Sequence, residues 1–330
     1  MRFYSIILCI LLFSCAKQEQ KTVTAPVVVR SNLTTAIAFQ NCIKFDDGYV
    51  VSTKNNELYY LNTDFQIDEV RTKEIQPNID AEYFYVYRGK MLLAISYEDD
   101  DPTYFLNENA KWTLLDFEES DAIFYEDETY IVTTICHGEF GGTVFFKHKK
   151  TNKIYSCKAT CLVDISKSED AYYLTTNLAH MIGFSEIIKV NDPTKLKALG
   201  DREATNNWWM KAGMSHEELK KGTEIMLDTT NVLTFDSFII NDKVYTMHES
   251  SSEDFAFSIL NPNIVLSIVE EGRLKNIDTL LRYPPEMSLE TSQRTNDGAF
   301  FYFNADSDAK GSIITVKNDT VRVISLKKAN

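Results

Sequence analysis

Short runs of strand-forming residues alternate with polar turn pairs along most of the chain. The pattern is clearest in residues 43–70, IKFDDGYVVSTKNNELYYLNTDFQIDEV, where four such runs are separated by Asp47-Gly48, Asn55-Asn56 and Thr63-Asp64. Because short turns of this composition join antiparallel neighbours in a sheet, this segment predicts a four-stranded meander.

The same pattern recurs at intervals of about 40 residues. The further units lie at residues 83–117, 122–157, 171–199, 238–281 and 298–326. A four-stranded meander of this length is typical of a propeller blade. We therefore predict an all-β fold over residues 36–330, a β-propeller of six blades. A seven-bladed ring with one degenerate blade is the alternative, and residues 26–30 (PVVVR) could add a strand that closes the ring.

Residues 201–231 interrupt the repeat and are predicted to be an insertion that carries one short helix. Ser215 is placed as an N-cap, and Gly222 is expected to end the helix. The adjacent Trp208 and Trp209 could form an aromatic platform for a sugar or peptide, or could pack the insertion against the blades. His216 begins an HEEL sequence that lacks the second histidine of the zinc-binding HExxH helix, so it does not indicate a metalloprotease.

The N-terminal segment indicates export. Arg2 precedes an apolar run, Phe3 to Phe13, which is too short to span a bilayer and has the layout of a secretory signal peptide. The sequence LFSC, ending at Cys15, resembles the lipobox of bacterial lipoproteins, although Phe13 departs from the usual residue at its position. The resemblance implies that residues 1–14 are removed and that Cys15 is acylated. An ordinary signal peptide in which Cys15 is incidental is the alternative.

Residues 15–35 after the cleavage site are polar at first and are predicted to be a flexible tether. Lys17 stands where some lipoproteins of this kind carry an aspartate that retains them in the inner membrane. We therefore expect an outer-membrane lipoprotein of the cell envelope, facing either the periplasm or the outside. The lipid on Cys15 would attach the protein to the membrane.

The charge of the chain argues against nucleic acid as a partner. Its 34 lysines and arginines are outnumbered by 48 aspartates and glutamates, which gives a formal charge of −14. No block of basic residues stands out, and neutralisation of phosphates by such a block drives most binding to nucleic acid.

Candidate chemistry gathers at the loops between the second and third strands of the blades. ICHGEFGG places His137 and Glu139 in this loop of the third blade, and His180 and His248 are predicted at the same position in the fourth and fifth blades. The second and sixth blades add carboxylates at Asp99, Asp101 and Asp306. Imidazoles and carboxylates on one face could hold a divalent metal or perform acid-base chemistry.

A simpler interpretation explains the same residues. Gly138, Gly141 and Gly142 fit a tight turn, and His137 and Glu139 beside them can simply be solvated. The run from Asp99 to Asp101 fits a solvated turn, because it lacks the ligand spacing of a calcium-binding loop.

Cysteine usage fits an oxidising compartment. Apart from Cys15 and the cysteine of the signal peptide, four thiols remain, at Cys42, Cys136, Cys157 and Cys161. They allow three full pairings, among which the sequence does not choose. Cys157 and Cys161 are close enough in sequence for a local disulfide.

Two functions fit these observations. The first is a binding or scaffold module that presents one loop-rich face to an envelope protein, a peptide or a glycan. The alternative is a metal-dependent hydrolase or lyase that uses His137, His180 and His248 as ligands and Glu139 as base. No nucleophile elbow, phosphate-binding loop or dinucleotide fingerprint is present.

Overall fold

The computed structural model describes most of the chain. It describes residues 25–78, 83–95, 102–115, 123–179, 183–200, 220–250, 263–282, 287–295, 298–305 and 310–329. Several predicted features lie outside the described residues: the signal peptide, Cys15, Asp99, Asp101, His180, the helical part of the insertion with Trp208 and Trp209, and Asp306. In the part that is described, no helix is long and apolar enough to cross a membrane.

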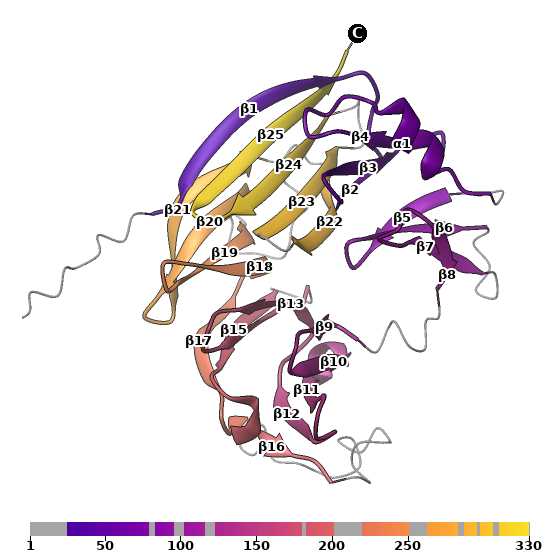
Figure 1. Cartoon of the computed structure of the whole chain (residues 1–330). Helices are drawn as coiled ribbons and strands as arrows, with labels where there is room; N and C mark the ends of the chain where they lie inside the picture. Colours follow the sequence, from indigo (N-terminus) through magenta and orange to yellow (C-terminus); the bar gives the residue numbers. More distant parts are fainter. Residues whose placement is uncertain are drawn as a thin grey trace, which may run out of the picture.

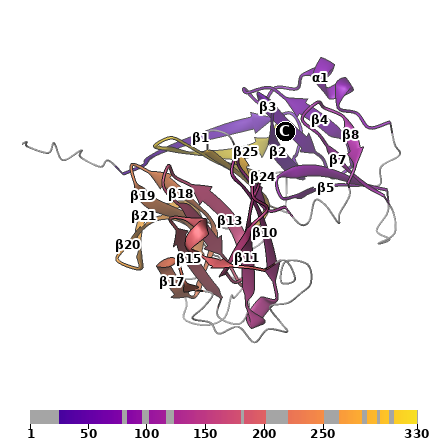
Figure 2. The same ribbon diagram turned by 60° about the horizontal axis from the view of Figure 1, so that its bottom comes forward.

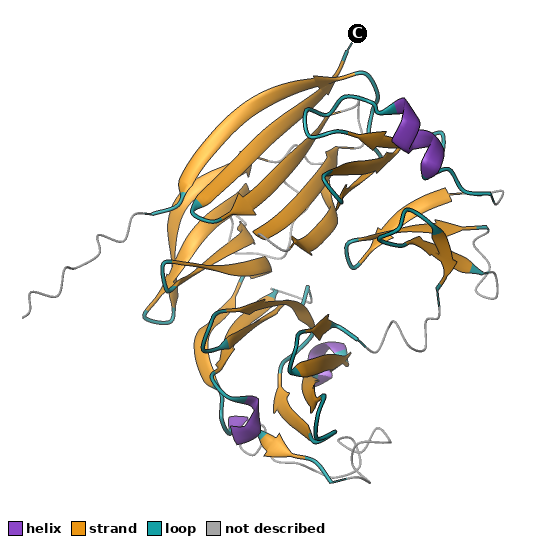
Figure 3. Ribbon diagram, in the orientation of Figure 1, coloured by secondary structure: helices purple, strands orange, loops and turns teal. Residues whose placement is uncertain are grey.

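The protein is a six-bladed β-propeller. Six antiparallel sheets lie around a common centre, and strands make up nearly all of the described elements (Figure 1 and Figure 3). The first blade is formed by β2 (Asn41–Phe45), β3 (Gly48–Ser52) and β4 (Leu58–Leu61). The second is formed by β5 (Tyr83–Tyr87), β6 (Lys90–Ala94), β7 (Thr103–Leu106) and β8 (Trp112–Leu114). The third is formed by β9 (Tyr125–Glu126), β10 (Tyr130–Cys136), β11 (Gly142–His148) and β12 (Ile154–Lys158), with β16 (Lys197–Ala198) at its edge. The fourth blade is formed by β13 (Leu162–Lys167), β14 (Tyr172–Thr176), β15 (Phe184–Val190) and β17 (Glu224–Thr230). The fifth is formed by β18 (Val232–Ile240), β19 (Lys243–Ser250), β20 (Asn263–Glu270) and β21 (Arg273–Arg282). The sixth is formed by β22 (Met287–Thr295), β23 (Gly298–Ala305), β24 (Lys310–Lys317) and β25 (Thr320–Lys328).

The N-terminal strand β1 (Val27–Thr35) completes the last blade. It pairs in parallel with β25 from Val27 opposite Thr320 to Thr35 opposite Lys328, and both views show it along that strand (Figure 1 and Figure 2). Residues 15–35 were predicted to be a flexible tether, but residues 27–35 of that segment form a strand. They supply the ring-closing strand expected from residues 26–30, and the chain passes from it directly into the first blade.

The first blade has three strands and not the predicted four. Its fourth position is taken by α1 (Glu69–Glu74). Asp68 caps this helix: its side chain accepts hydrogen bonds from the backbone N–H groups of Val70 and Arg71 at 3.0 Å each. The segment QIDEV suits a strand by its alternation. Asp68 followed by Glu69 is, however, also a strong helix start, because carboxylates satisfy the free N–H groups of a first turn.

The predicted insertion 201–231 is shorter than expected at its C-terminal end. Residues 224–230 form β17, the outer strand of the fourth blade, which pairs with β15 from Phe184 opposite Thr230. The alternation in EIMLDTT is weak because an outer strand has few buried positions, and only Leu227 is buried in it.

Apolar side chains pack between neighbouring blades. Ile43 and Met91 belong to one cluster between the first two blades, and Leu266 and Phe303 to another between the last two. Each is 2% exposed or less, and burying a side chain of this size contributes about 1.5–3 kcal/mol. This packing holds the turns of adjacent blades in fixed relative positions.

The interface between the fourth and fifth blades is polar near the centre. Thr175 Oγ1 donates to Ser237 Oγ at 2.6 Å, and Thr234 Oγ1 donates to the carbonyl of Thr176 at 3.0 Å. All four side chains are fully buried. Their hydrogen bonds tie β14 of the fourth blade to β18, the innermost strand of the fifth, and satisfy groups that would otherwise be costly to bury.

Candidate functional site

The predicted histidine loop has the expected place in the third blade. His137 follows β10, and the 3-10 turn η1 (Gly138–Phe140) leads into β11. The backbone N–H of His137 donates to the Gly141 carbonyl at 2.8 Å, and Gly138 and Gly141 have φ values of 59° and 99°. The glycines are therefore explained by the turn itself. Glu139 is exposed, and Phe140 at the tip keeps 84% of its surface exposed.

The disulfide in this region differs from the predicted one. Cys136 at the end of β10 is joined to Cys161, with 4.6 Å between their Cα atoms, and Cys157 is a free, buried thiol. Burial raises the pKa of Cys157 to about 12. Cys157 lies on β12 with its side chain in the core between the third and fourth blades, while Cys161 is bonded to Cys136. The bridge links the His137 loop to the beginning of the fourth blade.

His248 lies inside strand β19 and not in a loop. Its side chain is 2% exposed, and Nε2 is 2.9 Å from Ser267 Oγ on the neighbouring strand β20. Burial lowers its pKa, which favours the neutral ring. Among the residues that the structure describes, no three His, Cys, Asp or Glu side chains are placed to hold a metal ion.

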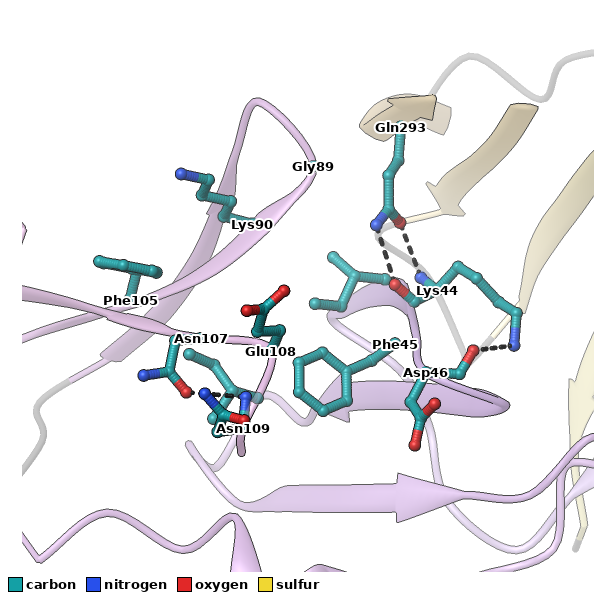
Figure 4. Close-up of a pocket in the computed structure, with 12 residues that line it drawn as sticks. Lys44, Phe45, Asp46, Gly89, Lys90, Phe105, Asn107, Glu108, Asn109 and Gln293 are labelled. Atoms are coloured by element: carbon teal, nitrogen blue, oxygen red, sulfur yellow. Dashed lines mark hydrogen bonds between the residues drawn. The ribbon is translucent and has the colours of Figure 1, made fainter. Parts of the chain in front are cut away.

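An open pocket lies where the first, second and last blades meet (Figure 4). Its volume is about 590 Å³, within the range of small-molecule sites. The turns β2–β3, β5–β6 and β7–β8, with residues of the strands beside them and of β22, supply the lining, listed here in chain order: Ile43, Lys44, Phe45, Asp46, Gly89, Lys90, Phe105, Leu106, Asn107, Glu108, Asn109 and Gln293.

A rigid contact between blades forms one side of this pocket. Gln293 on β22 accepts from the Lys44 backbone N–H through Oε1 and donates through Nε2 to the Lys44 carbonyl, at 2.8 Å each. Gly89 in the β5–β6 turn lies against the same glutamine; a Cβ atom at Gly89 would be 2.7 Å from Gln293 Cγ. Its φ of 71° also favours glycine.

The remaining lining residues offer an apolar floor with charges at the rim. Phe45 and Phe105 are half-buried, and Lys90 Nζ lies 4.9 Å from the centre of the Phe105 ring. Glu108 is exposed in the β7–β8 turn, and Figure 4 shows its side chain on the side toward Phe45. The Asn107 side chain fixes this turn by accepting from the backbone N–H groups of residues 109 and 111 at 3.0 Å each.

In the sequence analysis these turns were placed inside predicted blade units, but no site was assigned to them. The pocket uses first-to-second and third-to-fourth turns, which emerge on the face opposite the His137 loop because consecutive strands alternate in direction. The turn pairs Arg88-Gly89 and Asn107 to Ala110 were available as signals. The sequence contained no signal that these turns lie close to Gln293, which is about 200 residues further along the chain.

A buried ionic group near the ring centre was also missed. Arg294 on β22 donates to the carboxylates of Asp164 on β13 and Asp236 on β18, and to the Ser237 carbonyl at 2.8 Å. Both aspartates follow residues that bulge out of the pairing register, Val163 and Phe235. The Asp236 side chain is 1% exposed, and its burial, together with the nearby Asp164 charge, raises its pKa well above the usual range despite Arg294.

The comparisons with known proteins assign neither a family nor an activity to the chain. No family model matches the chain, and no curated protein matches it in sequence. Among solved structures it is similar to a prolyl endopeptidase, at 9% identity and a TM-score of 0.35 over 86% of this chain and 41% of that chain. It is also similar to the computationally designed Ika8 protein (7%, TM-score 0.34, 91% and 99% covered) and to BamB from Moraxella catarrhalis (9%, TM-score 0.27, 78% and 80% covered). The chain thus spans about two fifths of the endopeptidase, and these similarities assign no activity.

Proposed function

We propose that this protein is a lipid-anchored binding module of the bacterial cell envelope, which captures a peptide segment of a partner protein in the pocket between the first, second and last blades. The observation that carries the proposal is the pocket itself. It is open, its walls are held together by the Gln293–Lys44 hydrogen bonds, and it combines an apolar floor with side chains of both charges.

A peptide fits this lining better than a uniformly polar ligand. The half-buried rings of Phe45 and Phe105 offer contact to an apolar side chain, and contact of this kind dominates the energy of most interfaces. Lys90 and Glu108 are both exposed at the rim and come from the same blade. They suit a segment in which an apolar residue is flanked by charged ones, and they would set its direction.

The anchor is supported by sequence alone. LFSC at residues 12–15 places a cysteine where bacterial lipoproteins are acylated, and Val27 begins the first strand only 12 positions later. An extended chain of that length reaches at most about 40 Å. The propeller would therefore stay close to the membrane surface and meet partners located there.

Peptide selection tests the binding function. A displayed random-peptide library is panned on the purified protein, and the affinity of selected peptides is measured for the wild type, Lys90→Glu and Glu108→Lys. We expect each reversal to weaken binding about tenfold, because it replaces attraction by repulsion at the rim. Lys275→Glu is the matched control for Lys90→Glu, since it makes the same charge change at a β21 side chain that is 74% exposed and does not line the pocket.

The outcomes separate the alternatives. Peptides that bind the wild type and all three variants equally would show that the pocket is not the site. Binding of members of a glycan panel, with no peptide selected, would reassign the ligand class. The anchor is tested separately by incorporation of labelled palmitate into the wild type and Cys15→Ala; equal labelling of both would rule out acylation at Cys15.

A further inference from the structure

A second cavity lies between the outer strands of the fifth and sixth blades. Its volume is about 400 Å³, and it is separate from the peptide pocket. Its lining comes from β1, β21, β24 and β25 and consists of Arg30, Ser31, Asn32, Leu280, Leu281, Arg282, Ser312, Val323 and Ser325. Six of these nine residues are polar or charged, which is unusual between two blades that otherwise meet through apolar side chains.

The strand register explains how the polar groups come together. Asn32 pairs with Ser325, and Ser325 pairs with Ser312, so the three residues form one row across β1, β25 and β24. Directly paired residues point to the same face of a sheet. Arg30 lies two positions before Asn32 on the same face of β1, where it pairs with Val323.

The row has hydrogen-bonding capacity that the described part of the chain does not use. Within the described residues, the side chains of Asn32, Ser312 and Ser325 make no hydrogen bond to protein, although Ser312 is only 4% exposed. The Ser312 hydroxyl is not one of the enclosed, unpaired polar atoms of the described residues, so it is open to the cavity, and Asn32 is exposed. Hydroxyl and amide groups that converge on one cavity without protein partners indicate a polar ligand.

The charges of the cavity define the ligand further. Arg30 is held in place by an ion pair with Asp278 at 2.9 Å and by a hydrogen bond to the Thr279 carbonyl at 2.8 Å. Arg282, at the end of β21, forms no ion pair with any described residue. Two guanidinium groups therefore face one carboxylate, in a chain whose formal charge is −14. The local excess of positive charge favours an anion.

We propose that this cavity is a binding site for a phosphate ester. Guanidinium groups bind phosphate through paired N–H donors, and hydroxyl and amide groups supply the additional donors that a phosphate accepts. The cavity is larger than a phosphate group alone, which leaves room for a small polar substituent. The ester could come from a lipid headgroup or from a soluble metabolite. Because β1 begins 12 positions after Cys15, a lipid headgroup is within reach of an anchored protein.

The site is tested by titrating the full chain carrying Cys15→Ser with glycerol phosphate and inorganic phosphate, with glycerol as the neutral control. We expect Arg282→Gln to weaken phosphate binding about tenfold, because it removes one charge-assisted contact. Arg322→Gln is the matched control: it removes the same charge from β25 at a residue adjacent to Val323, on the opposite face of the strand. Asn32→Asp, at an exposed position, serves as a second variant and should also weaken binding.

Vesicle flotation distinguishes the source of the ester. Binding to phosphatidylglycerol in phosphatidylcholine vesicles, lost in Arg282→Gln, assigns a lipid headgroup. Binding of glycerol phosphate without vesicle binding assigns a soluble ester. The proposal is overturned if no phosphate probe binds below about 10 mM, or if Arg282→Gln and Arg322→Gln weaken binding equally, since that would reflect net charge alone.

Discussion

The side-chain amide of Gln293 hydrogen-bonds to both the N–H and the carbonyl of Lys44, two residues that are 249 positions apart in the chain. The amide takes the place of a neighbouring strand's backbone and so joins the innermost strands of the last and first blades. Ring closure in this protein therefore has two parts, strand β1 at the outer edge and Gln293 near the centre.

Replacing Gln293 by leucine should loosen this closure. The substitution keeps the size of the side chain but leaves a partly buried N–H and carbonyl of Lys44 without partners, which costs about 1–3 kcal/mol. Urea unfolding should show the loss, with peptide affinity falling in parallel because the pocket wall is no longer fixed. Gln293→Glu should be at least as destabilising, since a carboxylate cannot donate to the Lys44 carbonyl. Unchanged stability in both variants would contradict a structural role for the amide.

Removing Arg294 should destabilise the protein more strongly. Arg294→Gln leaves Asp164 and Asp236 near one another without their shared cation, and breaking a buried ion pair in this way costs about 3–5 kcal/mol. The double variant Arg294→Gln/Asp236→Asn should recover much of the loss, because it removes the repulsion. Additive effects in the unfolding free energies would show that the two residues do not interact.

Asp236 should make stability depend on pH. Its folded pKa is raised, mainly by burial, above the value of about 3.9 in an unfolded chain. Between these two values the folded state holds a proton that the unfolded state has lost, so the contribution of Asp236 to stability decreases as pH rises through its folded pKa. The unfolding free energy of the wild type minus that of Asp236→Asn should therefore fall as pH increases above about 4. Parallel pH profiles for the two proteins would argue against a raised pKa.

The disulfide should stabilise the third and fourth blades. Cys136 and Cys161 enclose a loop with a sequence separation of 25, and removal of such a bridge typically costs about 2–4 kcal/mol. Cys136→Ser and Cys161→Ser should show equal losses in urea unfolding, and the double variant should lose no more than either. Peptide mapping under non-reducing conditions checks the pairing directly; a fragment joining Cys157 to Cys161 would contradict it.

The two free cysteines of the described residues should be inert in the folded protein. Cys42 and Cys157 are both fully buried, and burial raises the pKa of each thiol, so neither forms the reactive thiolate at neutral pH. Neither should react with iodoacetamide until denaturant is added, when both should react at similar rates. Rapid alkylation of Cys157 in the native state would be inconsistent with its place in the core.

The architecture followed from local pattern, but several individual elements did not. Alternating runs and turn pairs are set by residues close in sequence, so the propeller and its six blades were predictable. QIDEV alternates like a strand, yet Asp68 caps a helix there. EIMLDTT lacks alternation, yet it forms β17 against β15. In the first case a local helix cap outweighed the alternation, and in the second the pairing with β15 decided the structure.

What the sequence by itself determined is the repeated strand-and-turn unit, and with it the fold. Only the tertiary structure decided which side chains meet. The pairing of Cys136 with Cys161, the burial of His248, the Gln293–Lys44 contact and the row of Asn32, Ser325 and Ser312 all depend on strand register or on ring closure. The reason is physical: closing the ring brings together segments from both ends of the chain, and no local pattern records which turns or faces then lie opposite one another.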